Sequence, residues 1–338
     1  MPRLVHGRVV GACKLPSEHA LLHAPKLHWF LKSDAPPSTP ASIDWSGPAM
    51  SVITDIEGND QYGDCVMAED AHYLAILTGN ANALYAYSRA QTLADYAALT
   101  GFNPSNPNSD QGTDPIADLN WRVQKGYADG SKDAGWMLVD ASSQALVRLA
   151  LSEFGNLKLW FGIPDAIIQS MSSLGPGFVW DVTAGSPNSA SGHCIGAAGY
   201  NPKQIQAVDV TEQGVIVTTW GMMGLITWAA LAAWMVPSQG GGAAVRVNMD
   251  WVNKASGNAP SGVNAAALIT AFNLYFGGNL PVPPSPSPSP SPTPTTTATL
   301  AQAEQWAAAG INRGHLLLTR SQAIAAANAG LAAGFGQP

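Results

Sequence analysis

The chain has little charge and no excess of positive charge. Only 12% of its 338 residues are charged, and 16 Lys and Arg against 23 Asp and Glu leave a formal net charge of −7. A nucleic-acid-binding surface needs a basic patch, so we expect no nucleic-acid partner. Hydrophobic residues make up 46% of the chain. That is enough for a sizeable core in one large domain or two smaller ones.

Cysteine is also scarce. Cys13, Cys65 and Cys194 are too few for a disulfide framework, and an odd number is typical of a reducing compartment. Residues 1–16 contain no apolar stretch of the length that a secretory signal needs. We therefore expect a cytoplasmic location, or a place in a virion if the chain leaves the cell by lysis or assembly.

One uncharged segment, residues 215–236, is long enough to cross a membrane. It contains two glycines and three threonines, and its pattern changes in the middle. We interpret it as a buried strand, a turn at Gly221–Gly224 and a helix capped by Thr227. The sequence therefore predicts no membrane contact.

The chain divides into four parts by composition: an extended arm at 1–45, a main domain at 46–278, a linker at 279–298 and a tail at 299–338. The main domain has helical patterns first and strand patterns later, which favours an α+β fold with a mostly antiparallel sheet. Helices are predicted at 65–77, 81–98, 116–125 and 143–153. Strands are predicted at 157–163, 177–182, 194–200, 205–210 and 214–220.

Alternating proline in the linker favours an extended polyproline conformation that cannot pack a core. The tail repeats one pattern, starting at Thr299 and again at Thr319, in which a threonine N-cap precedes alanines and a closing glycine. This predicts a small helical hairpin, which is too short for a core of its own. A partner, a second copy of the chain or the main domain would complete it; a weakly ordered tail is the alternative.

Cys65 follows the polar turn Gly58–Asp64 and opens an apolar run, so we expect it in the first turn of a helix. Free backbone N–H groups there favour a thiolate, although the neighbouring Asp64 carboxylate opposes it. A reactive thiol also needs a base. His72 lies two helical turns away, beyond hydrogen-bond reach, and we interpret it as a core or cleft-wall residue. His193 is the better candidate, because it opens a strand of small residues ending in Gly199-Tyr200.

The order of these features resembles that of the papain-like cysteine peptidases. A Gly-x-Cys opens a helix, a Gly-His opens a strand ending in Gly-Tyr, and a later strand ends in Trp220-Gly221. The interval from Cys65 to His193 fits as well, since such enzymes place the histidine roughly 130–150 residues after the cysteine. The blocks GNDxxGDC, GH…GY and TWG are closer still to a bacterial and phage branch of the family. The resemblance covers about 44–276, outside the arm, linker and tail.

The resemblance implies a papain-like fold, in which a helical part with Cys65 at a helix N-terminus packs on an antiparallel sheet carrying His193. It makes Cys65 the nucleophile and His193 the base. Asn59 by alignment, or Gln61 by residue type, would hold the oxyanion together with the Cys65 N–H. Thr218 falls where the family has an asparagine that orients the histidine, and a threonine holds the ring less firmly.

Two functions follow as hypotheses. In the first, the chain is a cysteine peptidase or amide hydrolase that acts on a peptide or protein substrate through Cys65 and His193. In the second, it is a papain-fold structural or interaction protein of a phage particle or other assembly, with a vestigial site, held by its arm and tail. Cys194 is expected in the core, because alternation points it away from His193. No cofactor or metal site is predicted.

Overall fold

The computed structural model describes residues 2–29, 38–251 and 258–262. The predicted linker and all of the chain beyond it, which is the predicted tail hairpin at 299–338, lie outside the described residues. The described residues 2–28 and 38–251 form one compact unit, which holds the elements named below.

The helices of this unit are short apart from one. They are α1 Glu18–His23, α2 Met50–Ile53, α3 Cys65–Asn80, α4 Arg89–Thr100, α5 Pro115–Gln124, α6 Gln144–Phe154, α7 Asp165–Gln169 and α8 Trp228–Trp234. The strands are β1 Arg3–Val5, β2 Arg8–Val10, β3 Ile43–Asp44, β4 Asp133–Leu138, β5 Leu157–Gly162, β6 Phe178–Trp180, β7 Gly192–Tyr200, β8 Gln204–Ile205, β9 Val208–Asp209, β10 Gly214–Thr219, β11 Met222–Thr227 and β12 Gly242–Asn248.

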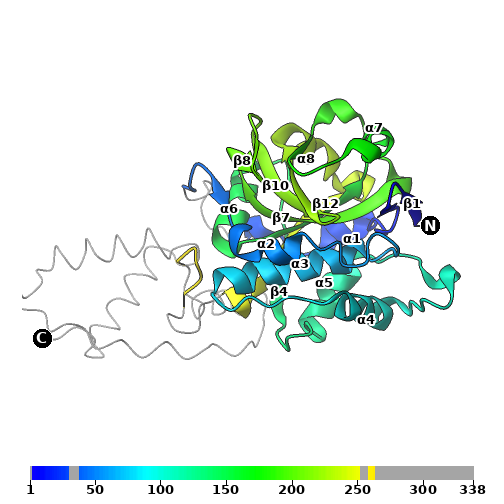
Figure 1. The fold of residues 1–338 in the computed structure, drawn as a ribbon. Helices are drawn as coiled ribbons and strands as arrows, with labels where there is room; N and C mark the ends of the chain where they lie inside the picture. Colours follow the sequence, from blue (N-terminus) through cyan, green and yellow to red (C-terminus); the bar gives the residue numbers. More distant parts are fainter. Residues whose placement is uncertain (1, 30–37, 252–257, 263–338) are drawn as a thin grey trace, which may run out of the picture. The chain divides into compact units, whose positions relative to one another are not determined.

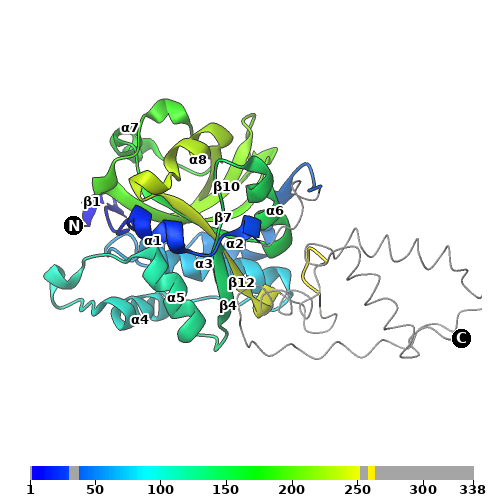
Figure 2. The ribbon, with the colours of Figure 1, turned by 180° about the vertical axis from the view of Figure 1, so that it is seen from behind.

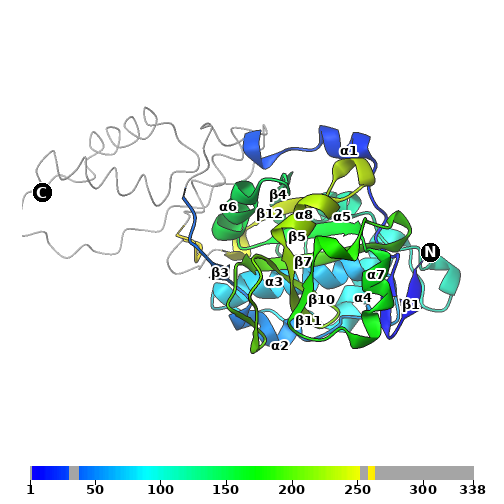
Figure 3. The same cartoon turned by 90° about the horizontal axis from the view of Figure 1, so that it is seen from above.

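The central sheet runs in the order β4-β12-β5-β7-β10-β11-β6, and β3 also pairs with β7 (Figure 3). Its neighbours are antiparallel except for β11 and β6, which are parallel. Helices come early and strands late in the chain, as the sequence predicts, and the α+β class with a mostly antiparallel sheet is confirmed.

Helices cover both faces of this sheet (Figures 1 and 2). Helix α3 packs on β7 and β10, whereas α8 packs on β10 and β11. Helix α4 packs on α3, and α5 packs on β4. Helix α3 therefore lies between the sheet and α4, and its residues 65–79 are all buried. The predicted core helix beginning at Cys65 is confirmed.

Three sequence predictions need correction. The helix predicted at 81–98 begins only at Arg89, because Ser88 and Gln91 form a capping box there. In place of the strand predicted at 205–210, the structure has two short antiparallel strands, β8 and β9, of two residues each. Of the turn predicted at Gly221–Gly224, residues 222–224 belong to β11, and the turn that joins β10 to β11 consists of Trp220 and Gly221. No helix within the described residues is long and apolar enough to cross a membrane.

The described part of the arm packs into this unit. Strands β1 and β2 form a hairpin, and Val9 and Val10 of β2 and the following Ala12 are almost completely buried. Figures 1 and 3 show this hairpin beside α7, where Arg8 donates hydrogen bonds to the carbonyl groups of Met171 and Leu174. The described arm is therefore integrated into the fold.

A cluster of charged side chains lies buried between α3, α5, β5 and β12. The Lys158 Nζ contacts the carboxylates of Glu69, Asp70 and Asp118. Arg246 pairs with Glu69 and Asp70, at 2.5 Å each, and Arg122 pairs with Asp70 at 2.8 Å. A buried charge is tolerated only when it is paired, so these contacts fix α3 against the sheet.

The Lys158→Met variant tests this cluster. It leaves three buried carboxylates short of a cation, and we expect the free energy of unfolding to fall by about 3–5 kcal/mol in urea titrations. The control is Arg89→Ala, which breaks a half-exposed pair with Asp60. It should lower stability by less than about 1 kcal/mol. Equal effects of the two changes would contradict the proposed role of Lys158.

Candidate active site around Cys65

Cys65 is the first residue of α3, and its side chain is only 1% exposed. The pKa of its thiol is raised to about 12, chiefly by burial and in smaller part by the nearby Asp64 carboxyl. Hydrogen bonds with the backbone of Cys194 and Val66, and the Lys158 cation, act in the opposite direction. The helix N-terminus thus supplies the expected stabilisation of a thiolate, but desolvation outweighs it in this structure.

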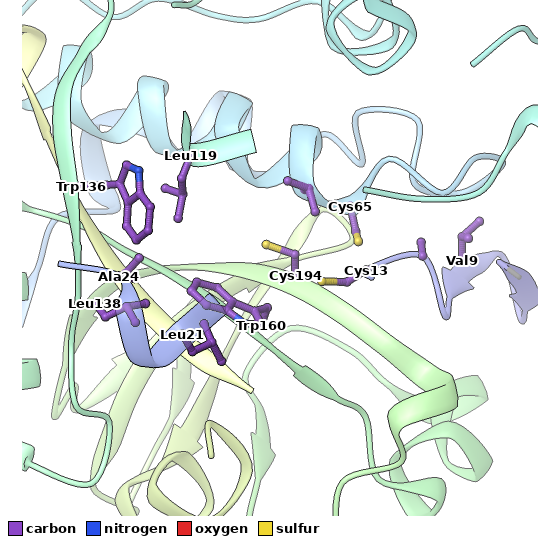
Figure 4. Close-up of a cluster of buried hydrophobic side chains, with 13 residues drawn as sticks. Val9, Cys13, Leu21, Ala24, Cys65, Leu119, Trp136, Leu138, Trp160 and Cys194 are labelled. Carbon is purple, nitrogen blue, oxygen red and sulfur yellow. The ribbon is translucent and has the colours of Figure 1, made fainter. Parts of the chain in front are cut away.

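The three cysteines meet in one apolar cluster. Figure 4 shows the side chains of Cys13, Cys65 and Cys194 close together, with Trp160 beside them. All three are free thiols and buried. They come from the arm, from α3 and from β7, so this cluster lies where the arm, the helical part and the sheet meet. The prediction that Cys194 belongs to the core is confirmed.

Asp64 lies at the N-cap position of α3, but its side chain does not cap the helix. Its Oδ1 accepts a hydrogen bond from the Asn59 amide at 3.3 Å. Burial raises the pKa of the Asp64 carboxyl well above its usual range. A raised pKa favours the neutral form of the carboxyl, and this lessens the opposition to a thiolate that is expected from Asp64.

His193 is the second residue of β7, and its ring is held on two sides. Its Nε2 makes a 2.7 Å hydrogen bond with the Thr219 hydroxyl, and the Trp220 indole stacks on it at 4.2 Å between ring centroids. The Nδ1 atom is buried and has no hydrogen-bond partner among the described residues. Burial lowers the pKa of His193 to about 3, so the ring is neutral at physiological pH.

The predicted orienting residue, Thr218, is not the partner of His193. Thr218 pairs with Gly196 across β10 and β7, and a side chain on Gly196 would meet the Thr218 Oγ1 and Glu69. Thr218 therefore faces α3. Because side chains alternate along a strand, Thr219 faces the other side of the sheet, where His193 lies. The hydroxyl that holds the ring comes from the next residue along the strand.

Trp220 reaches His193 through an unusual backbone conformation. Its φ of 48° and that of Gly221, 71°, both lie in the left-handed region. This is the pattern of a tight two-residue hairpin, and it is unfavourable for a bulky side chain. The pairing of β10 with β11 holds Trp220 in this conformation, which places its indole on the imidazole.

The two candidate oxyanion residues point elsewhere in this structure. The Asn59 Nδ2 donates to the Tyr62 carbonyl and to Asp64, so its hydrogen atoms are already engaged within the turn. Gln61 is exposed on the same turn. Their assignment as oxyanion donors therefore stays a prediction that requires a rearrangement of the turn before α3.

The structure brings Cys65 to the start of β7 but does not join it to His193. The Cys65 thiol contacts the backbone of Cys194, the residue after His193, and no hydrogen bond links the thiol to the imidazole among the described residues. Alternation places the His193 ring on the opposite side of the strand from Cys194. The discounted candidate, His72, is buried in α3 with its Nε2 at 2.9 Å from the Asp55 carbonyl.

The arm covers Cys65, which the sequence did not indicate. The Cys13 N–H donates to the Gly192 carbonyl at 3.1 Å, and the Thr113 N–H donates to the Ala12 carbonyl at 3.0 Å. These bonds join the arm to the sheet on one side and to the loop before α5 on the other. The only sequence signal was the pair of valines at 9 and 10, which is typical of a buried strand.

The chain resembles known proteins in its backbone structure and not in its sequence. No family model matches the chain, and no curated protein matches its sequence. Among solved structures, the chain is similar to xylellain, a cysteine protease from Xylella fastidiosa, at 12% identity and a TM-score of 0.45, over 64% of this chain and 91% of that one.

It is also similar to the bromelain protease from Ananas comosus, at 11% identity and a TM-score of 0.42, over 62% of this chain and 99% of that one. Digestive procathepsin L2 proteinase from Tenebrio molitor matches at 13% identity and a TM-score of 0.42, over 72% of this chain and 78% of that one. Identities this low do not carry catalytic residues from one chain to another.

The buried state of His193 predicts a pH dependence of stability. The unfolded chain takes up a proton on this residue below its ordinary pKa of 6.5, whereas the folded chain excludes the proton until about pH 3. The contribution of His193 to the free energy of unfolding is therefore fully present above pH 6.5. It falls as the pH decreases, by up to about 1.4 kcal/mol per pH unit. His193→Gln removes this loss.

We expect the difference in unfolding free energy between the wild type and His193→Gln to narrow between pH 7 and pH 5 in urea titrations. The same change at the exposed His19 is the control, because it replaces a surface histidine and leaves the buried His193 ring in place. A difference that stays constant over this range would show that His193 accepts a proton in the folded chain.

Proposed function

We propose that the chain is a cysteine hydrolase of the papain-like type that cleaves peptide or amide bonds, in a form whose nucleophile is covered. The observation that carries this proposal is the meeting of Cys65, at the N-terminus of a buried helix, with the first residues of the strand that bears His193. The order of sequence blocks around both residues supports the same assignment.

His193 has the properties of a positioned base. Thr219 and Trp220 fix its ring, and its buried Nδ1 is left without a partner. In the proposed reaction Nδ1 accepts the Cys65 proton, and the thiolate attacks the substrate carbonyl carbon. The imidazolium returns the proton to the leaving nitrogen as the C–N bond breaks, and water then hydrolyses the thioester. Asn59 or Gln61 and the Cys65 N–H are the proposed oxyanion donors.

This reaction requires the site to change from its present state. The arm must leave, and the Cys65 thiol and the His193 ring must turn toward one another. Solvent admitted by departure of the arm also removes the main cause of the raised thiol pKa, which is burial. The helix N-terminus and the Lys158 cation then favour the thiolate.

A second candidate is a structural or interaction protein with a vestigial site. The observation that favours it is the present state of the thiol, which is buried, protonated and without a hydrogen bond to His193. We keep the phage-particle or other assembly role as a proposal under this candidate, with self-association through residues 299–338, which lie outside the described residues.

Site-resolved alkylation decides between the two candidates. Iodoacetamide is applied near neutral pH to the wild type and to an arm-loosened variant, Arg8→Ala, which loses the hydrogen bonds to Met171 and Leu174. The labelled cysteines are identified by peptide mass spectrometry. A catalytic Cys65 should label faster in the variant than Cys194, and His193→Gln on that background should remove the acceleration.

Two threonine variants on the same background provide matched controls. Thr219→Val removes the hydroxyl that holds the His193 ring, and a loss of about 1 kcal/mol of positioning lowers the Cys65 labelling rate about fivefold. Thr218→Val removes a buried hydroxyl that has no partner, so the rate should stay unchanged. If His193→Gln leaves the labelling rate of Cys65 unchanged in the arm-loosened chain, the catalytic role is refuted.

A further inference from the structure

The segment that covers Cys65, residues 9–14, is held by backbone hydrogen bonds on both sides. On the helical side, the Val9 N–H donates to the Asn59 carbonyl at 3.0 Å, and the Lys14 N–H donates to the Thr113 carbonyl at 2.9 Å. On the sheet side, the Cys13 N–H donates to the Gly192 carbonyl at 3.1 Å. Between these bonds the segment bends at Gly11, whose φ is 74°. Backbone bonds of this kind bind a chain with little regard to its side chains.

Glycines form the parts of the groove that touch this segment. A Cβ on Gly112 or on Gly192 would collide with the carbonyl oxygen of Ala12 or of Cys13, respectively. A Cβ on Gly63 would lie 3.2 Å from the Cβ of Ala12. The arm backbone therefore rests directly on the backbone of both walls, and the missing side chains are what make room for it.

This close approach limits which side chains fit beside Cys65. Ala12 is completely buried, and Cys13 is 5% exposed and lies close to Cys65 and Cys194 (Figure 4). A side chain larger than alanine at position 12 must displace Gly63 or the chain around Gly112. Close packing makes such an enlargement unfavourable.

We propose that this groove is a binding site for peptides with two successive small residues, and that residues 9–14 are its tethered occupant. The Val9, Ala12, Cys13 and Lys14 backbone contacts are those that an external peptide would make. The proposal deepens the proposed function by naming a substrate class, and cleavage of such a peptide rests on that function. Binding itself does not.

The test compares chains in which the arm or the wall is altered. Ala12→Leu enlarges the occupant and leaves the groove intact, so the arm should leave and open the groove to a peptide in solution. Gly192→Ala alters the wall, so it should expel the arm and also exclude the peptide. In the wild type, the tethered arm competes at a high effective concentration and should keep the peptide out.

The probe is a fluorescent peptide of residues 8–16 with serine in place of Cys13, followed by anisotropy on the full chain. We expect the Ala12→Leu chain to bind it at least about tenfold more tightly than the wild type or the Gly192→Ala chain does. A second peptide, with leucine also in place of Ala12, should bind the Ala12→Leu chain at least about tenfold more weakly than the first. Leu4→Asp, an exposed change in the same arm, should behave as the wild type.

Alkylation of Cys65 in the same samples reports whether the arm has left. An Ala12→Leu chain that exposes Cys65 but binds neither peptide, or binds both equally, overturns the proposal. So does a folded Ala12→Leu chain in which Cys65 stays protected. If that chain fails to fold, Ala12→Val makes the same comparison with a smaller enlargement. Binding without hydrolysis would refute the proposed function and leave the binding site standing.

Discussion

The pairing of charges on α3 is the constraint on which the rest of the structure depends. Glu69 and Asp70 lie in the second turn of a helix that is buried on all sides, and Lys158 and Arg246 neutralise them from the sheet. Unpaired charges at such positions are costly, so α3 has one register in which it can pack on the sheet. That register sets Cys65, one turn earlier, against the first residues of β7.

The same register explains why the site is incomplete without a movement. Cys65 is placed against the backbone of Cys194, on the α3 side of β7, whereas Thr219 and Trp220 hold the His193 ring from the other side. The arm fills the space above the thiol and keeps water from it. A buried, protonated thiol and a neutral imidazole are stable together in this state. Admission of solvent favours the charged form of each group.

Much of the fold could be predicted from the sequence, because its signals are local. The polar turn before Cys65 and the apolar run after it locate the start of α3, and the small residues after His193 locate β7. Thr219 could not be chosen over Thr218, because the choice depends on the register between β10 and β7. That register shifts between Ile216 and Val217.

The arm and the charge cluster were missed for a different reason. The bonds from Ala12 and Cys13 reach Thr113 and Gly192, which are far away in the sequence, and backbone contacts leave no pattern of side chains to recognise. The charge cluster did leave a signal. Lys158 and Arg246 are single charges inside apolar strands, and such residues are buried only with partners.

The central claim is that the arm is what protects Cys65. The most direct test measures amide hydrogen exchange at Val9, Cys13 and Lys14 and alkylation of Cys65 on the same wild-type sample, and converts each into a free energy of opening. If the arm is the cover, the two free energies agree. Exchange of the arm amides at the rate of an unstructured peptide, while Cys65 stays protected, would contradict the account.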